Sequence, residues 1–197
     1  MKKLKGMKLL KEGKSQKPFL FVPPRSNNDP FPSHSNAFKE AADELVAARM
    51  TATNGPNKDF LAEPILYLYR HALEHGLKDL VRLGVRYGEI MASASLKKSL
   101  GQHFLDPLWQ AVKGMLLGSN LKRDQIDFIE ARVKELETVD PDGQTLRYER
   151  DRTNKRNRPF NGIQTIDLEN LLDVSRELFQ ILDGWHSGIW DFHMQEV

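Results

Sequence analysis

Residues 58–83 read KDFLAEPILYLYRHALEHGLKDLVRL and form the longest periodic segment of the chain. On a helix at ~100° per residue, most of the circumference of this segment is apolar. We therefore predict that it is the central helix of a helical domain, surrounded by other elements. Its polar side chains fall within an arc of roughly 140°, which holds Tyr67, Arg70, His71, Glu74, His75 and Lys78. Charged groups on such a helix are costly unless they are exposed, paired or functional, so this arc is the candidate site.

The composition fits one soluble domain with an additional tail. The chain has 197 residues, and its 29 basic and 27 acidic residues nearly balance. Cysteine is absent, which excludes a disulfide framework and thiolate metal sites. No apolar run approaches ~18 residues, so we expect no membrane span and no membrane partner. Lysines interrupt any apolar core that a signal peptide would need, and we expect a cytoplasmic protein.

Apolar residues recur at helical spacing on both sides of the central helix, at 38–50, 104–116, 126–136 and 168–182. Ser35 or Asn36 is expected to cap the first of these helices, and Gly184 is expected to end the last. His103 is interpreted as an N-terminal cap or a core contact. The tryptophans, at 109, 185 and 190, are expected in the core. We predict an all-α fold, an antiparallel helical bundle of about five main helices with few strands.

Two basic segments accompany the bundle. Residues 1–35 combine lysines with Pro, Ser and Asn, which predicts a partly disordered arm and leaves 36–197 as the domain. The apolar run at 19–22 is expected to pack against the domain or a partner. The non-periodic stretch 140–164 is predicted to be a long loop. Basic side chains neutralise nucleic-acid phosphates, so the candidate RNA-binding set is Lys78, Arg147, Arg150, Arg152, Lys155, Arg156 and Arg158. A solvated tail is the alternative for the arm.

The run Arg70-His71-Ala72-Leu73-Glu74-His75 resembles the ribonuclease motif of the HEPN superfamily of bacterial helical-bundle proteins, an Arg and a polar residue followed at a distance by His. The segments 103–109, 140–148 and 166–168 also resemble members of that superfamily, and the resemblance covers roughly residues 36–184. It implies a HEPN-like bundle that forms a homodimer. It also implies a metal-independent endoribonuclease without cofactor, in a toxin–antitoxin or phage-defence setting, with an antitoxin or defence protein as partner.

In the ribonuclease interpretation, Arg70 and His75 are catalytic, and His71 and Glu74 support them. The attacking 2′-hydroxyl must lose a proton, and an imidazole titrates near working pH. Arg70 would neutralise the charge that develops on the phosphate, and Glu74 would fix an imidazole tautomer. A symmetric dimer would bring two such pairs together.

Two other interpretations stay open. In the first, the domain is a non-catalytic module for dimerisation or for a partner, nucleotide-like ligand or nucleic acid. Arg70, Glu74 and Lys78 then form an i,i+4 ladder worth about 0.2–0.5 kcal/mol per pair, and the histidines are structural. In the second, His71, Glu74 and His75 match the H-x-x-E-H pattern of a zinc hydrolase. That site needs a third ligand, for which Glu149 or His103 is available, but the scarcity of strands counts against it.

Overall fold

The computed structural model describes residues 33–51, 60–117, 122–149, 155, 160 and 165–194. The chain divides into two compact units, residues 1–30 and 31–197, and every described residue belongs to the second. The described residues contain six α-helices and no strand, so the predicted all-α fold is confirmed for this part of the chain. Most of the predicted arm, including its apolar run, lies outside the described residues.

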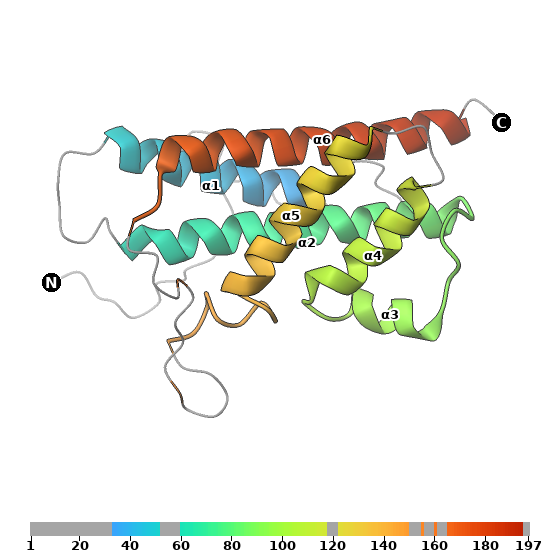
Figure 1. Cartoon of the computed structure of the whole chain (residues 1–197), viewed down its shortest axis with the longest axis horizontal. Coiled ribbons are helices and arrows are strands. Elements are labelled where there is room, and N and C mark those ends of the chain that lie inside the picture. Colours follow the sequence, from blue (N-terminus) through green and yellow to red (C-terminus); the bar gives the residue numbers. More distant parts are fainter. Residues whose placement is uncertain are drawn as a thin grey trace, which may run out of the picture. The chain divides into compact units, whose positions relative to one another are not determined.

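The six helices form two layers. Their bounds are α1 (Ser33–Thr51), α2 (Ala62–Arg86), α3 (Ala94–Leu100), α4 (Leu105–Leu116), α5 (Arg123–Val139) and α6 (Leu168–Met194). α1 runs antiparallel to α2 and α6, which share one direction (Figure 1). α4 and α5 form an antiparallel pair across this layer, with α4 against α2 and α5 against α6, and the short α3 packs on α4. The bundle is thus antiparallel in part, because the chain passes through the second layer between α2 and α6.

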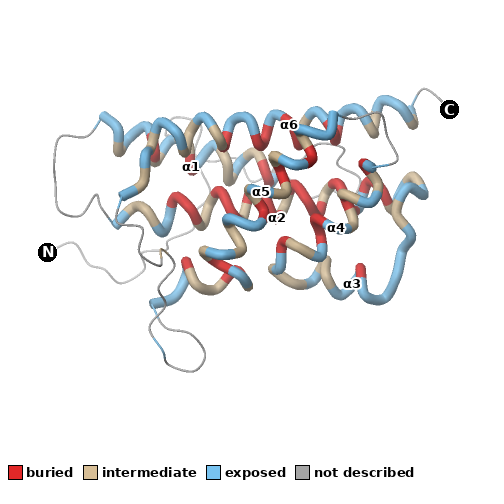
Figure 2. The backbone as a smooth tube through the Cα atoms, viewed as in Figure 1, coloured by how far each residue is buried: buried red, intermediate tan, exposed pale blue. Residues whose placement is uncertain are grey.

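α2 is the central helix, as predicted. It packs against α1, α4 and α6, and buried residues recur along its whole length (Figure 2). Trp109 of α4 and Trp185 of α6 are both buried, with ring centroids 6.4 Å apart and an angle of 19° between the planes. Trp190 differs from the prediction, because it is only half-buried and contacts Tyr87 edge-on. Burying each large apolar side chain stabilises the folded state by roughly 1.5–3 kcal/mol. This packing energy is larger than the intrinsic helix preference of any single segment.

The starts of two helices follow from local hydrogen bonding. α2 begins at Ala62 and carries Pro64 in its first turn, where a missing N–H breaks no helical hydrogen bond. Ser35 was predicted to be a cap, and this is wrong, because Ser35 lies inside α1. Its hydroxyl donates to the carbonyl oxygen of Ala72 at 2.9 Å and is buried against α2. The serine therefore ties α1 to α2.

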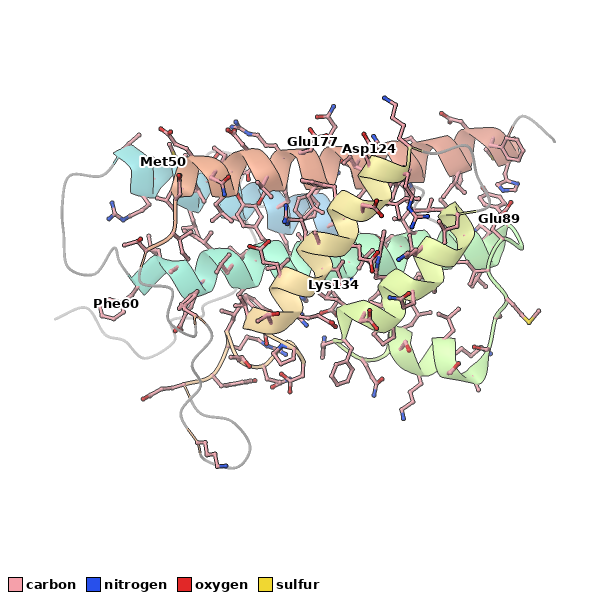
Figure 3. The ribbon with its side chains drawn as sticks, in the orientation of Figure 1. Met50, Phe60, Glu89, Asp124, Lys134 and Glu177 are labelled. Carbon is pink, nitrogen blue, oxygen red and sulfur yellow. The ribbon has the colours of Figure 1, made fainter. Side chains whose placement is uncertain are left out.

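Side chains from α5 organise α4. The Glu137 carboxylate accepts hydrogen bonds from the backbone N–H of Leu105 at 3.1 Å and of Asp106 at 2.8 Å, and it caps α4. Because Glu137 fills this role, the interpretation of His103 as the cap is wrong. Glu130 pairs with Lys113 of α4 and with Lys134 of α5. Lys134 and Asp124 lie on the outer side of α5 (Figure 3).

α6 does not end at Gly184, so that prediction is wrong. The helix continues to Met194 and buries Leu178, Ile181, Leu182 and Trp185 at helical spacing. Gly184 itself is exposed on the opposite side. A glycine inside a helix costs ~1 kcal/mol relative to alanine, which is less than the burial of a tryptophan contributes. The apolar pattern on both sides of the glycine therefore decides the length of the helix.

We expect Gly184→Ala to raise the free energy of unfolding by about 0.5–1 kcal/mol, because alanine restricts the unfolded chain and favours helix. A Cβ added at this position meets no atom within 4 Å, so no steric cost opposes the gain. Urea unfolding followed by far-UV circular dichroism measures the change. Gly188→Ala, equally unobstructed, is the matched variant, and loss of stability in both would contradict a continuous α6.

Candidate functional site

The polar arc of α2 divides between two environments. Arg70, Glu74 and Lys78 are buried, with 2%, 2% and 7% of their surface exposed. Tyr67, His71 and His75 are half-buried, and the two histidines contact Phe38 of α1. The sequence placed these six side chains on one arc, and packing separates them into a buried charged set and a partly open aromatic set.

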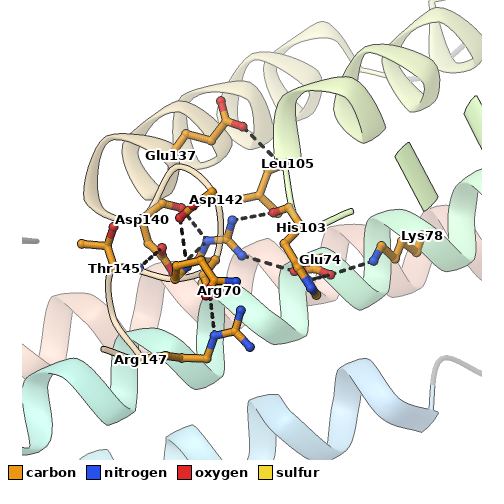
Figure 4. Close-up of polar contacts among 12 residues, drawn as sticks. Arg70, Glu74, Lys78, His103, Leu105, Glu137, Asp140, Asp142, Thr145 and Arg147 are labelled. Atoms are coloured by element: carbon orange, nitrogen blue, oxygen red, sulfur yellow. Dashed lines mark hydrogen bonds and ion pairs between the residues drawn. The ribbon is translucent and has the colours of Figure 1, made fainter. Parts of the chain in front are cut away.

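Arg70 is the hub of the buried set (Figure 4). Its Nε donates to the carbonyl oxygen of Asp140 at 2.8 Å, and its Nη2 donates to the carbonyl oxygen of His103 at 2.6 Å. Its Nη1 donates to Glu74 Oε2 at 3.2 Å. Asp140 Oδ2 lies 3.3 Å from Nε without hydrogen-bond geometry, so that contact is electrostatic. One guanidinium therefore joins α2, the residues before α4 and the end of α5.

Glu74 links this hub to two further groups. Its Oε1 lies 2.7 Å from Lys78 Nζ and 3.0 Å from His103 Nδ1. Burial alone would raise the pKa of Glu74, but the hydrogen bonds and charges of Lys78 and then of His103 outweigh burial and lower it. Glu74 is therefore ionised at neutral pH, which requires that Nδ1 of His103 carries the hydrogen. We refer to Arg70, Glu74, Lys78, His103 and Asp140 as the Arg70 network.

A tight turn closes the network. Asp140 Oδ1 accepts from the backbone N–H of Thr145 at 2.8 Å, and Gly143 has a φ of +72°. A Cβ at Gly143 would lie 2.9 Å from His103 Cβ and 3.1 Å from Arg70 Nη1. Both the left-handed backbone and the close approach to the guanidinium require glycine here. The turn thus covers Arg70 and leaves it almost without contact with solvent.

This geometry bears on each predicted catalytic residue. Arg70 is committed to three protein acceptors, whereas His75 contacts His34, Phe38 and His71, so the two residues have different partners. Glu74 fixes the tautomer of His103, which lies outside α2, and not that of His71 or His75 as predicted. His103 thus belongs to the site, although through a buried network.

The half-buried set forms an aromatic surface between α1 and α2. The Tyr67 ring is stacked on His71, with centroids 5.5 Å apart and 15° between the planes. His71 and His75 meet edge-on at 4.6 Å. Phe38 lies 4.4 Å from His71 and 5.8 Å from His75. We refer to Phe38, Tyr67, His71 and His75 as the histidine face.

Burial keeps the imidazoles of this face uncharged. It lowers the pKa of His75 to about 4, and the neighbouring His71 lowers it further, whereas Glu74 opposes the change. Burial also lowers the pKa of His71, again opposed by Glu74. Both imidazoles are therefore neutral at pH 7 and can accept a proton or a hydrogen bond.

The candidate RNA-binding residues have diverse positions. Arg147 is exposed, with its Cζ 5.7 Å from the Tyr67 ring and 5.8 Å from the Tyr148 ring, and its Nε donates to the carbonyl oxygen of Gly143. Lys155 is also exposed. Lys78 is buried against Glu74. The remaining four arginines, at 150, 152, 156 and 158, lie outside the described residues. Arg147 is thus the predicted basic residue that the structure brings to the histidine face.

Two contributors were missed by the sequence interpretation. Asp140 lies at the start of the predicted loop, although an Asp-Pro-Asp-Gly run after a helix signals a tight turn. Phe38 was assigned only to the core of the first helix. Its contact with the histidines depends on how α1 and α2 pack, and no local signal in the sequence reports that packing.

Within the described residues, no group of three or more His, Asp or Glu side chains is arranged to hold a metal ion. The H-x-x-E-H interpretation thus has no third ligand in place there, and its Glu74 is bound to Lys78 and Arg70. No helix in this part of the chain is both long and apolar enough to cross a membrane. No protein-family model, curated protein or solved structure matches the chain.

We expect Arg70→Met to lower the free energy of unfolding by about 3–5 kcal/mol, because it leaves Asp140 buried without a cation and Glu74 with Lys78 alone. Arg70→Lys should also destabilise, since an ammonium cannot reach three acceptors in the plane of a guanidinium. Urea unfolding measures both. Arg82→Ala on the same helix is the control, because its side chain is 55% exposed and surface pairs contribute roughly 0–1 kcal/mol. Equal effects at the two positions would contradict the buried network.

Stability should fall as the pH is lowered from 7 to 5, and His75→Gln should remove part of that dependence. The unfolded chain protonates His75 near its ordinary value of about 6.5, whereas the folded protein does so only near 4. Between these values the unfolded state binds more protons, so stability rises with pH. Urea midpoints at each pH test this, with Ser187→Gln on α6 as a variant without a titrating change. An unchanged slope in His75→Gln would refute the burial of the imidazole.

Proposed function

We propose that this chain is a non-catalytic helical-bundle module that binds single-stranded RNA through the histidine face and Arg147. The observation that carries the proposal is the contact of the Arg147 guanidinium with the Tyr67 ring, which is itself stacked on His71. Aromatic rings stack on unpaired bases, and a nearby arginine neutralises the adjoining phosphate. The HEPN-like character of the bundle and its homodimeric state belong to this proposal.

The burial of Arg70 supports binding without cleavage. A transition-state phosphate needs cationic donors that are free and aimed at it. Arg70 is 2% exposed and donates to Glu74 and to two backbone carbonyl oxygens. Binding a phosphate would require breaking these bonds and uncovering two buried carboxylates, which costs several kcal/mol. The role of Arg70 that fits these contacts is structural.

Arg147 has the exposure that a ligand contact requires. It forms no ion pair with a described carboxylate. Its Nε is held by the carbonyl oxygen of Gly143, which leaves its Nη donors for a ligand. The turn that covers Arg70 thus also orients Arg147 over Tyr67. The basic residues that follow Arg147 in the sequence would extend contact along the RNA backbone.

Metal-independent RNA cleavage in a toxin–antitoxin or phage-defence setting is the second candidate function. The contact of His71 with His75 at 4.6 Å favours it, because one neutral imidazole can act as the base and pass a proton on as the acid, with the other imidazole beside it. In this candidate, catalysis would proceed without direct help from Arg70.

We expect Arg147→Ala and Tyr67→Ala each to weaken binding of a fluorescein-labelled single-stranded RNA by about tenfold or more, because each removes a stacking or charge contact. Arg147→Ala should also reduce the slope of log affinity against log salt by about one. Fluorescence anisotropy measures both. Arg176→Ala on α6, with a side chain 60% exposed, is the matched control. Equal affinity in all four proteins would refute this surface.

A cleavage assay distinguishes RNA binding from RNA cleavage. Incubation of the RNA in EDTA with the wild-type protein and His75→Ala should leave both samples intact. Cleavage by the wild type that His75→Ala abolishes would overturn the non-catalytic proposal and support the second candidate. Arg70→Ala is unsuited as the sole probe, because a loss of activity in that variant would also follow from unfolding.

A further inference from the structure

The two imidazoles of the histidine face share one partly enclosed position. Phe38 of α1 lies against both rings, and Tyr67 is stacked on His71. His34 of α1 lies 5.7 Å from His75. Both imidazoles remain half-buried, so part of each ring meets solvent. Two nitrogen-bearing rings in edge contact can donate hydrogen bonds to neighbouring oxygens of one ligand group once both are protonated.

Two permanent cations, Lys78 and Arg147, act on this position. The charged and titratable groups that act on His71 and His75 come from α1, α2, the residues before α4 and the turn after α5. They are His34, Glu74, Lys78, His103 and Arg147. Glu74 is the single acidic group among them, and its charge is shared by Arg70 and Lys78. Protonation of both imidazoles would therefore add positive charge beside Lys78 and Arg147 unless an anion balances it.

We propose that His71 and His75, together with Arg147, recognise a phosphomonoester, either the terminal phosphate of an RNA chain or the phosphate of a free nucleotide. The inference rests on the proposed function and names the group that this surface selects. A phosphomonoester is close to a dianion at pH 7, because its second pKa is about 6. It carries more charge than an internal phosphodiester. A terminal phosphate can also approach half-buried imidazole rings, because it is attached to the RNA on one side only. An internal phosphodiester is attached to the RNA chain on both sides.

Binding of this group takes up protons. The imidazoles are neutral in the free protein, and the dianion favours their charged forms, so the complex binds more protons than its separate components. Affinity therefore increases as the pH falls from 8 towards 6.5. Below that range the phosphate itself becomes protonated, and the increase levels off.

The test compares RNAs of one sequence that carry a 5′-phosphate, a 3′-phosphate or hydroxyl groups at both ends. At pH 7, one phosphorylated form should bind the full-length protein about tenfold more tightly than the hydroxyl form, the factor expected for a charge-assisted contact. His71→Gln and His75→Gln should each reduce this preference to about twofold or less. His193→Gln, at a histidine stacked on Tyr87 at the far end of α6, should retain it. Circular dichroism establishes that the variants are folded.

Calorimetry gives a second, independent readout. Titration with a nucleoside 5′-monophosphate in two buffers of different ionisation enthalpy should show net proton uptake at pH 7, and His75→Gln should reduce it. Binding of the monophosphate as tightly as the phosphorylated RNA supports recognition of the phosphate and assigns a free nucleotide as its source. Equal affinity for phosphorylated and hydroxyl RNA overturns this inference and leaves RNA binding intact. Failure of every RNA and of the monophosphate to bind overturns the proposed function as well.

Discussion

A buried guanidinium is the constraint on which the rest of this domain depends. Arg70 connects α2 to two segments that lie far from it in the sequence, through the carbonyl oxygens of His103 and Asp140. Buried ion pairs add little net stability compared with apolar contacts, but loss of one partner is severe. The network therefore specifies how the second helical layer docks on the first. Its two arginine and lysine charges are matched by Glu74 and Asp140, so it adds no net charge to the core.

The same network explains why the polar residues of α2 lie in two different environments. On an α-helix, side chains five residues apart point about 140° away from each other, so Arg70 and His75 face different neighbours. His71 and His75, four apart, remain together on the side of α1. The five-residue spacing of Arg70 and His75 makes the run resemble a ribonuclease motif. The same spacing makes it difficult for the two side chains of one chain to meet at one site. The proposed RNA contacts at the partly open side therefore use the histidines and Arg147, while Arg70 makes buried contacts beneath them.

Much of the fold could be predicted from apolar spacing alone, because residues such as Leu73 and Trp109 have one stable place, the core. The end of α6 could not, since a glycine signal at 184 competes with a buried tryptophan one residue later. The site was predicted as one set of polar residues on α2, and the structure divides these residues between a buried group and a half-buried group. The division of these residues into two groups could not be predicted from the sequence. Asp140 lies 70 residues from Arg70, and the contact of Phe38 depends on the docking of α1. Local sequence patterns predict neither the contact between Arg70 and Asp140 nor the docking of α1.

The carbonyl groups that hold Arg70 have a consequence for insertions and deletions. They come from main-chain atoms, so the length of the backbone between fixed helix ends cannot vary, whatever further contacts the side chains of His103 and Asp140 make. One residue added between α3 and α4, or between α5 and Gly143, would displace an oxygen that now lies 2.6 or 2.8 Å from the guanidinium. Length variation among natural variants of this chain would therefore concentrate away from these two connections.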